Sequence, residues 1–373
     1  KGRENLLLQS NQFDTTWTNG SSSETSGHTG YDGSNNAWKV TKTNAAGYIR
    51  QALSSSGVQT FSVYVKAADS NYVALYIASG TSASVWFNLT NGTTDSVNNA
   101  ITSSIESVGN GWYRCSLTAN LSLTDVRIYP AEAGSGVSAT SGSLYIQDAQ
   151  LESSMVATDY IETGASTAQA GILEDLPRLD YSGGASCPSL LLEPQRTNEA
   201  SYSEYFDIWT QTNGSVTAND IISPEGVQNG YKLTSTSSGT ASRVEIFPSL
   251  TDNTIYTGSA FVKKGNVNFA FLTIRPKTAV TESAFFDLEN GTITSEGNNP
   301  DGATIEPYGN GWYKISLSTN AETGGTTPRF QIALANTDGS VVTNVDEYIY
   351  VYGAQLEAGS YPTSYIPTMG SAV

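Results

Sequence analysis

Apolar residues recur at every second position along many short stretches of this chain. In the stretch 61–66, the apolar residues Phe61, Val63 and Val65 alternate with residues of more polar character. The stretch 328–331 alternates in the same way. Period-two alternation predicts β-strands with one face against a core and the other face directed outward. Since no stretch shows a 3.6-residue period of apolar residues, no amphipathic helix is predicted.

Asn-Gly pairs separate several of the predicted strands. Asn91-Gly92 and Asn290-Gly291 each lie between two alternating stretches. This pair is typical of two-residue hairpin turns, because both of its residues accept a positive φ angle. Many short strands with regular turn signals predict an all-β fold built from β-sandwiches of the jelly-roll type.

The chain contains two copies of one sequence pattern. Residues 110–117 (NGWYRCSL) match residues 310–317 (NGWYKISL), and the motif AQLE occurs at both 149–152 and 354–357. A repeat of this length predicts two jelly-roll domains joined by a short ordered connector. The predicted limits are 1–163 for the first domain, 164–195 for the connector and 196–373 for the second domain.

The charge balance narrows the classes of partner. The chain carries 35 acidic and 18 basic residues, a net charge of −17. Dense negative charge disfavours binding to the phosphates of nucleic acids. No run of apolar residues is long enough to span a bilayer, so we expect no membrane insertion. The low content of Lys and the high content of Ser, Thr and Asn fit an extracellular or virion-surface protein.

Residues for catalysis are few. His28 is the single histidine, and it lies in a loop of small residues without a neighbouring base or nucleophile. The two copies share few acids, and Asn88 of the first copy stands where the second has Asp287. We therefore expect that the chain is not an enzyme. A polysaccharide lyase or hydrolase remains an alternative, since 35 acids allow many carboxylate pairs.

The outward positions of the predicted strands combine aromatic rings with Arg, Lys and Asn. Rings stack on the apolar faces of sugars, and polar neighbours orient the hydroxyl groups. The competing interpretation is burial of these rings under a neighbouring element. In the aligned copies Trp86 corresponds to Phe285 and Tyr129 to Gln331, so the two outward faces are expected to differ. The candidate ligand-binding residues are Tyr64, Lys66, Trp86, Asn88, Arg127, Tyr129, Phe261, Phe285, Asp287 and Arg329.

The ends of each copy carry a family resemblance. The opening segment 5–17 and the closing segment 144–151 resemble the first and last strands of jelly-roll carbohydrate-binding modules. The connector resembles segments of bacteriophage tail and fibre proteins and of large marine bacterial surface proteins. The resemblance implies a non-catalytic glycan-binding or adhesion protein of a virion surface or the extracellular space, with a cell-surface or algal polysaccharide as partner. The alternative is a purely structural virion or scaffold module that makes protein–protein contacts, with a homo-oligomer such as a trimer in a fibre.

The same resemblance implies a structural Ca²⁺ ion between the first and last strands. Oxygen ligands suit this hard cation, and Asp14 and Asp148 are the matching candidates in the first copy. In the second copy Asp207 matches Asp14, but Gly353 stands where the first copy has Asp148. Without the resemblance, both acids of the first copy are interpreted as turn residues.

Overall fold

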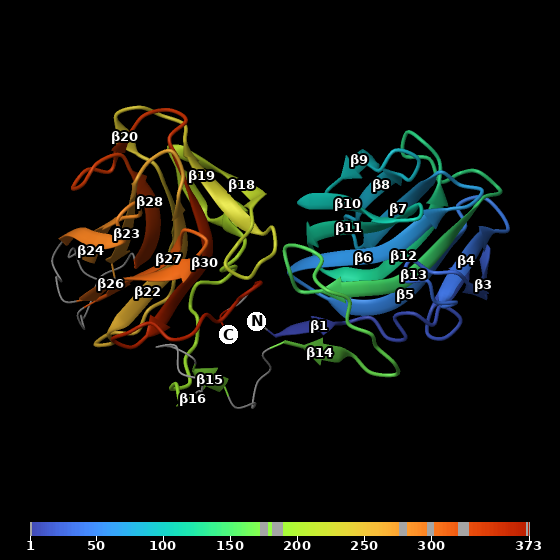
Figure 1. Cartoon of the computed structure of the whole chain (residues 1–373), viewed down its shortest axis with the longest axis horizontal. Coiled ribbons are helices and arrows are strands. Elements are labelled where there is room, and N and C mark those ends of the chain that lie inside the picture. Colours follow the sequence, from blue (N-terminus) through green and yellow to red (C-terminus); the bar gives the residue numbers. More distant parts are fainter. Residues whose placement is uncertain are drawn as a thin grey trace. The chain divides into compact units, whose positions relative to one another are not determined.

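A computed structural model of the chain describes residues 2–171, 178–180, 189–275, 282–296, 302–319, 328–370 and 372. The described residues form two compact units, Gly2–Leu176 and Pro177–Val373, each built almost entirely from antiparallel β-strands (Figure 1). The prediction of an all-β protein with two β-sandwich domains is therefore confirmed. Parts of the predicted connector, residues 172–177 and 181–188, lie outside the described residues.

Two six-stranded sheets form the first domain. One sheet has the strand order β10 (Thr102–Gly109), β11 (Trp112–Asn120), β6 (Val58–Ala67), β13 (Ser143–Glu152), β4 (Ala37–Lys42) and β3 (Ser22–His28). The other sheet has the order β2 (Thr18–Gly20), β5 (Tyr48–Ser55), β12 (Leu123–Ala131), β7 (Tyr72–Ala78), β8 (Ala83–Asn88) and β9 (Thr93–Asn98). A short pair, β1 (Arg3–Asn5) and β14 (Ala168–Ala170), joins the two ends of the domain.

The second domain repeats this topology strand for strand. Its first sheet has the order β26 (Ala303–Gly309), β27 (Trp312–Ser318), β22 (Tyr256–Lys264), β30 (Tyr348–Ala358), β19 (Gly230–Ser235) and β18 (Gly214–Ile221). Its second sheet has the order β17 (Thr210–Thr212), β21 (Arg243–Ile246), β28 (Arg329–Ala335), β23 (Phe269–Arg275), β24 (Glu282–Asp287) and β25 (Thr292–Glu296). The remaining elements are the pairs β15 (Arg178–Asp180) with β16 (Ser189–Leu191) and β20 (Thr240–Ala241) with β29 (Val342–Thr343), and the short 3₁₀ helix η2 (Phe206–Ile208).

The core of each domain lies between its two sheets. In the first domain Phe61, Val63 and Val65 of β6 are fully buried. They belong to one cluster with residues of the facing sheet such as Leu75 and Ile77 of β7. The alternation that predicted these strands thus separates the core side from the outer side. Burial of each such apolar side chain contributes about 1.5–3 kcal/mol to the free energy of folding.

A shared asparagine ties the two ends of each domain together. The Asn5 side chain is fully buried, and its Nδ2 donates to the carbonyl oxygens of Ala149 at 3.2 Å and Ile161 at 2.8 Å. Its Oδ1 accepts the backbone N–H groups of Leu7 and Leu151. In the second domain Asn198 makes the corresponding four bonds. One side chain therefore satisfies four buried backbone groups, which would otherwise be costly to bury.

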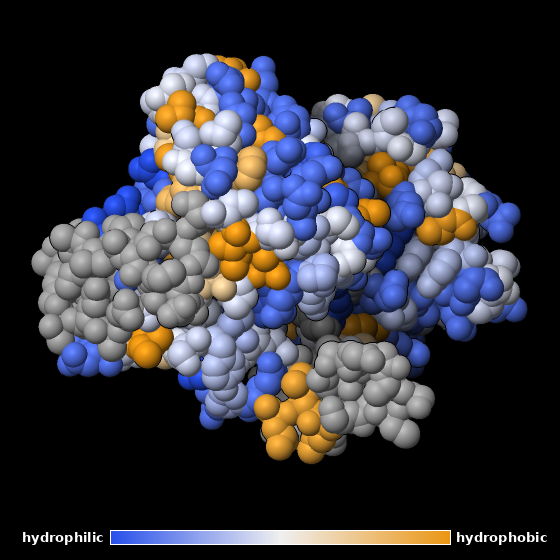
Figure 2. Space-filling model, turned by 60° about the vertical axis from the view of Figure 1, so that its left-hand side comes forward, coloured by the Kyte–Doolittle hydropathy of each residue, from blue (hydrophilic) through white to orange (hydrophobic). Residues whose placement is uncertain are grey.

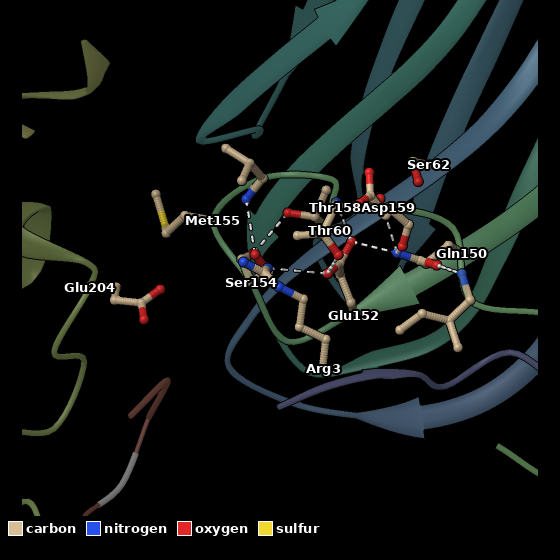
Figure 3. A network of polar contacts seen from close by, with 12 residues as sticks. Arg3, Thr60, Ser62, Gln150, Glu152, Ser154, Met155, Thr158, Asp159 and Glu204 are labelled. Atoms are coloured by element: carbon tan, nitrogen blue, oxygen red, sulfur yellow. Dashed lines mark hydrogen bonds and ion pairs between the residues drawn. The ribbon is translucent and has the colours of Figure 1, made fainter. Parts of the chain in front are cut away.

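The glutamate of the shared AQLE motif is also structural. Glu152 is 2% exposed and accepts hydrogen bonds from Gln150 Nε2, from Thr158 N and from Thr158 Oγ1, at 2.7–2.8 Å (Figure 3). Arg3 Nη1 lies 3.8 Å from its carboxylate. Glu357 has the same set of bonds with Gln355 and Thr363. The glutamate that both copies share at this position therefore holds the segment after the last strand against that strand.

The strand register corrects one part of the predicted alignment of the two copies. Trp86 faces Ala74 across β8 and β7, as Phe285 faces Phe271 in the second domain. Along the other edge of β7, Tyr129 of β12 pairs with Ala74. Along the other edge of β23, Ala333 of β28 pairs with Phe271. Tyr129 thus corresponds to Ala333, and the predicted match with Gln331 is wrong by two residues.

The surface is mostly polar. On the face drawn in Figure 2, hydrophilic residues cover most of the described surface, and hydrophobic residues form separate patches. Among the described residues, we find no helix with the length and hydrophobicity needed to cross a membrane. A polar surface with a net charge of −17 favours polar partners over apolar ones.

Candidate functional site

The described residues of the first domain form a polar cleft. Its volume of about 660 Å³ lies within the range of small-molecule sites in proteins. Four separate segments line it. The lining residues are Gln9, Asn11, Gln12, Ser26, Gly27, Asn35, Asn36, Trp38, Glu162, Thr163 and Gly164.

One wall of the cleft is the turn 9–12, which backbone bonds hold in place. Gln9 has a φ of 50°, and its carbonyl oxygen accepts the N–H of Gln12 at 2.9 Å. The N–H of Gln9 donates to the carbonyl oxygen of Gly164 at 2.8 Å, so the turn lies against the segment 162–164. This wall is therefore made where the two ends of the domain meet.

The floor of the cleft is Trp38 at the start of β4. Its ring is buried to 8% exposure, and its Nε1 donates to the carbonyl oxygen of Asn11 at 3.0 Å. Phe13 packs edge-on behind the ring, with the centroids 6.2 Å apart. The floor is thus apolar and fixed by packing and by one hydrogen bond.

Amide side chains dominate the walls. In the described part of the chain, the side chains of Gln12, Asn35 and Asn36 make no hydrogen bond to protein. The Oδ1 of Asn11 accepts the backbone N–H of Asp148 at 3.2 Å, which leaves its NH₂ group for another partner. An amide offers both donors and an acceptor, so the cleft can bind a ligand that is rich in hydroxyl groups.

A tyrosine–carboxyl cluster lies behind Asn11. Asp148 occupies a bulge in β13 with a φ of 53°, and Tyr31 Oη donates to its Oδ2 at 2.9 Å. Burial, followed by the negative charges of Asp32 and Glu162, raises the pKa of Asp148 to about 6. Burial and the Asp148 charge raise the pKa of Tyr31 above its ordinary value. A carboxyl that titrates near neutral pH therefore lies next to the cleft.

The two predicted calcium ligands lie in different surroundings. Asp14 is exposed and accepts a hydrogen bond from Thr15 Oγ1 at 3.2 Å. Asp148 is 7% exposed, and the acids whose charges act on it are Asp32 and Glu162. Among the described residues, no cluster of three or more His, Cys, Asp or Glu side chains is arranged to hold a metal ion. Calcium binding by Asp14 and Asp148, with backbone carbonyl oxygens as further ligands, stays a prediction.

Four of the predicted ligand-binding residues share the outer face of the sheet β2–β5–β12–β7–β8–β9, namely Trp86, Asn88, Arg127 and Tyr129. Tyr48, Tyr129, Tyr76 and Trp86 form a row there, with successive ring centroids 5.0, 4.9 and 5.3 Å apart. Arg127 forms an ion pair with Asp125 and lies 5.2 Å from the Tyr48 ring centroid. At the end of β8, Asn88 binds Tyr72 Oη and the N–H of Thr90.

The structure corrects the expected exposure of two of these rings. Trp86 is 5% exposed and Tyr129 is 6% exposed. Trp86 Nε1 donates to the carbonyl oxygen of Gly136, and Val137 packs against the same cluster. The loop after β12 therefore covers rings that strand alternation directs away from the core. Arg127 keeps 28% of its side chain exposed, and its contact with a ligand stays a prediction.

Tyr64 and Lys66 lie apart from this row, on β6 of the opposite sheet. The Tyr64 ring stacks on Tyr31 with the centroids 3.9 Å apart and an interplanar angle of 8°. Arg114 lies over it, at 5.3 Å from the ring centroid. Lys66 is half-buried opposite Trp112 on β11. Tyr64 thus holds Tyr31, and through it the loop that carries Asn35 and Asn36.

The candidates of the second domain also have protein partners. Phe261 was expected to face outward but is 4% exposed, because Tyr308, Tyr352 and Tyr365 pack around its ring. Phe285 packs on Phe271 at 4.5 Å between centroids.

The polar candidates of the second domain have structural partners as well. Arg329 pairs with Glu245 at 3.2 Å. Asp287 accepts the N–H groups of Glu289 and Asn290 in a hairpin turn. Burial acts to raise the pKa of Asp287, but the hydrogen bonds from Asn290 and Glu289 outweigh burial and lower it. These contacts stabilise the domain, and ligand contact by these residues stays a prediction.

The second domain has aromatic and buried acidic residues at the positions that correspond to the turn 9–12 of the cleft. Ser10 bonds Tyr160 Oη at 2.6 Å, and Ser203 bonds Tyr365 Oη at 2.7 Å, so Ser10 corresponds to Ser203. By this alignment Gln9, Asn11 and Gln12 correspond to Tyr202, Glu204 and Tyr205. Glu204 is fully buried and accepts hydrogen bonds from two tyrosine hydroxyls.

Sequence reasoning missed the cleft. In the sequence, the turn 9–12 forms part of the opening segment 5–17, whose resemblance predicts a strand and not a binding site. The available signal was the replacement of Gln9 and Gln12 by tyrosines in the second copy. This polar-to-aromatic change at two positions of one turn distinguishes the first domain, which has the cleft, from the second domain.

Comparison with known proteins shows no family for this chain. No protein-family model matches the chain, and no curated protein matches it. Among solved structures, it is similar to the enzymatically active domain of tailspike protein 4 of bacteriophage CBA120, at 16% identity over 43% of this chain and with a TM-score of 0.27. The chain spans 21% of the length of that structure. Oxalate decarboxylase from Bacillus subtilis matches over 90% of this chain and 74% of its own, at 8% identity and a TM-score of 0.11.

The tailspike match corrects the prediction that the chain is not an enzyme. The structure it resembles is described as enzymatically active, so absence of catalysis no longer stands as a conclusion. At a TM-score of 0.27 the likeness assigns no activity to this chain. The question of catalysis therefore depends on the residues of the site itself.

Proposed function

We propose that the first domain binds a polysaccharide in the polar cleft, as part of a virion-surface or extracellular protein. The observation that carries this proposal is the set of amide side chains around Trp38 that have no hydrogen-bond partner among the described residues, in a cleft of about 660 Å³. Sugars present hydroxyl groups that both donate and accept hydrogen bonds, and amides match both roles. The apolar floor suits the C–H groups of a sugar ring.

The comparison of the two domains supports a single ligand site per chain. Tyr202 and Tyr205 stand where the first domain has Gln9 and Gln12, with ring centroids 6.1 Å apart. Aromatic side chains there remove the amide donors and acceptors. Calorimetry on the whole chain is therefore expected to give one binding event per chain.

A glycan array followed by calorimetry tests the proposal. We expect Gln12→Ala and Asn36→Ala each to weaken binding about fivefold, because one net hydrogen bond is worth about 1 kcal/mol. Gln228→Ala is the matched control, since Gln228 precedes Asn229, the residue that corresponds to Asn36. A broad array without any bound glycan, or full affinity in both cleft variants, would contradict the proposal.

Cleavage of the bound glycan is a second candidate function. The observation that favours it is a pair of carboxyl groups: Glu162 lines the cleft, and the buried Asp148, with its pKa raised to about 6, lies directly behind the lining residue Asn11. A protonated carboxyl and an ionised one can act as general acid and base in glycoside hydrolysis. The reaction would add water across the glycosidic bond, with the proton going to the leaving oxygen. Release of reducing ends that disappears in Asp148→Asn and Glu162→Gln would support it, and intact polysaccharide near pH 6 would refute it.

The structural alternative has a separate test. A virion or scaffold module that assembles through its outer faces predicts a stable oligomer, such as a trimer, in light scattering. Glycan binding by a monomer would argue against assembly as the main function.

A further inference from the structure

We infer that the cleft selects neutral and amino-bearing sugars and rejects sugars that carry carboxylate or sulfate groups. This inference rests on the proposed glycan-binding function and names the class of sugar that the site takes. The observation that supports it is the distribution of charged side chains around the cleft.

The residues that line the cleft include one charged side chain, and it is negative. Glu162 is exposed to solvent at the rim, and none of the eleven described lining residues is Lys, Arg or His. An anionic ligand in this cleft therefore meets a carboxylate without a basic partner. Known sites for carboxylates and sulfates use Arg or Lys to offset the ligand charge.

Two further carboxyl groups, those of Asp32 and Asp148, add to the negative potential at the cleft. Asp32 and Glu162 both act on Asp148, so the three acids lie within electrostatic range of one another. Burial raises the pKa of Asp32, but bonds from Ser34 Oγ at 2.7 Å and Ser34 N at 3.0 Å outweigh burial and lower it. Asp32 is therefore ionised at neutral pH, and the field at the cleft is negative.

Three basic side chains of the sheet that carries β3 and β4 are engaged elsewhere, and His28, next to the lining residue Gly27, contacts Thr25 Oγ1 at 3.1 Å and packs against the Tyr145 ring. Lys39 follows Trp38 on β4 and so lies on the opposite face of the strand, where it pairs with Asp69 at 3.7 Å. Arg114 donates to the carbonyl oxygen of Thr158 and lies over the Tyr64 ring. Lys42 is bound by Glu132 at 2.9 Å. These contacts direct the cations away from the cleft.

The size of the selection follows from Coulomb's law. Two unit charges about 4 Å apart interact by about 1 kcal/mol in bulk water, and more strongly where the solvent is partly excluded. A carboxylate near Glu162 should therefore weaken binding about fivefold or more, and an ammonium group should strengthen it by a similar factor. Because the rim is solvated, added salt should reduce both effects.

A glycan array that contains neutral, amino-bearing and anionic glycans on many backbones provides the test. We expect binding to neutral and amino sugars, with anionic sugars weakest. Glu162→Gln should raise the anionic-to-neutral binding ratio about fivefold. Glu106→Gln is the matched control, because Glu106 is an exposed glutamate on β10, at the far edge of the sheet from β3 and β4. It should leave the ratio unchanged.

The outcomes separate the two proposals. Anionic glycans that bind as well as neutral ones, or a ratio that Glu162→Gln does not change, would overturn the charge selection while the glycan-binding proposal stands. An array without any bound glycan would overturn both. A ratio that rises in Glu162→Gln and with added salt, but not in Glu106→Gln, would support the inference.

Discussion

Asp148 is expected to destabilise the first domain above pH 6, and Asp148→Asn should relieve this. The side chain is 7% exposed at the bulge of β13, and burial with two neighbouring acids raises its pKa from 3.8 to about 6. Asparagine resembles the protonated carboxyl in shape and keeps an acceptor for Tyr31 Oη. It also tolerates the φ of 53° at this position, because asparagine is favoured in the left-handed region.

The magnitude follows from proton linkage. The folded state holds the Asp148 proton more tightly than the unfolded state does, so stability falls as pH rises between about pH 4 and pH 6. A shift of about two pKa units corresponds to about 3 kcal/mol. This contribution is fully present below the unfolded-state pKa and is lost as pH rises through the folded-state pKa. The variant should therefore be up to about 3 kcal/mol more stable than the parent at neutral pH, and equal to it near pH 4.

Native-state hydrogen exchange measures this effect within one domain. The two domains make global unfolding a poor readout, so the free energy should be taken from the amides of β13 and β6 at several pH values. Asp159→Asn serves as a control, because Asp159 is an exposed acid in the same region. A variant that is less stable than the parent at neutral pH, or parent amides whose opening free energy does not change with pH, would refute the reasoning.

Three further predictions concern the parts that hold the fold. Asn5→Ala should cost about 3–5 kcal/mol in the first domain alone and Asn198→Ala the same in the second, since each removes four buried hydrogen bonds; exchange of the two domains' amides measures both. Glu152→Gln should destabilise the first domain by about 1–3 kcal/mol, because an amide cannot accept all three donors that the carboxylate accepts; hydrogen exchange of the first domain's amides in this variant beside Asp159→Asn checks it. Trp86→Ala should cost about 3–5 kcal/mol and leave glycan binding unchanged, because Trp86 lies under the loop after β12 and outside the cleft; weakened binding in a folded variant would contradict this.

The strands and sandwich class could be predicted because alternation reports directly on burial. Phe61, Val63 and Val65 are core residues for the same reason that they recur at every second position. Alternation says which side of a strand a residue faces, but not what covers that side. Trp86 and Tyr129 face away from the core as expected, yet a loop closes over them. Their burial depends on tertiary contacts that no local pattern encodes.

Alternation also cannot fix register by itself. A shift of two residues keeps every side chain on its face, which is why Tyr129 was matched to Gln331 when its counterpart is Ala333. The cleft was missed for a related reason. Its walls come from the segments 9–12, 26–27, 35–38 and 162–164, which are brought together by the pairing of the chain ends. None of the four carries a recognisable motif alone.

The bond between Gln9 N and Gly164 O has a mechanical consequence. It joins the beginning and the end of the first domain behind the β1–β14 pair, so a pull on both ends loads that pair first and this junction next, before it reaches the two large sheets. The cleft lies across the same junction, with walls from both sides of it. A ligand held between the turn 9–12 and the segment 162–164 would therefore brace the domain against tension, and a protein pulled while attached to its glycan would be strengthened at the junction through which tension passes into the two sheets.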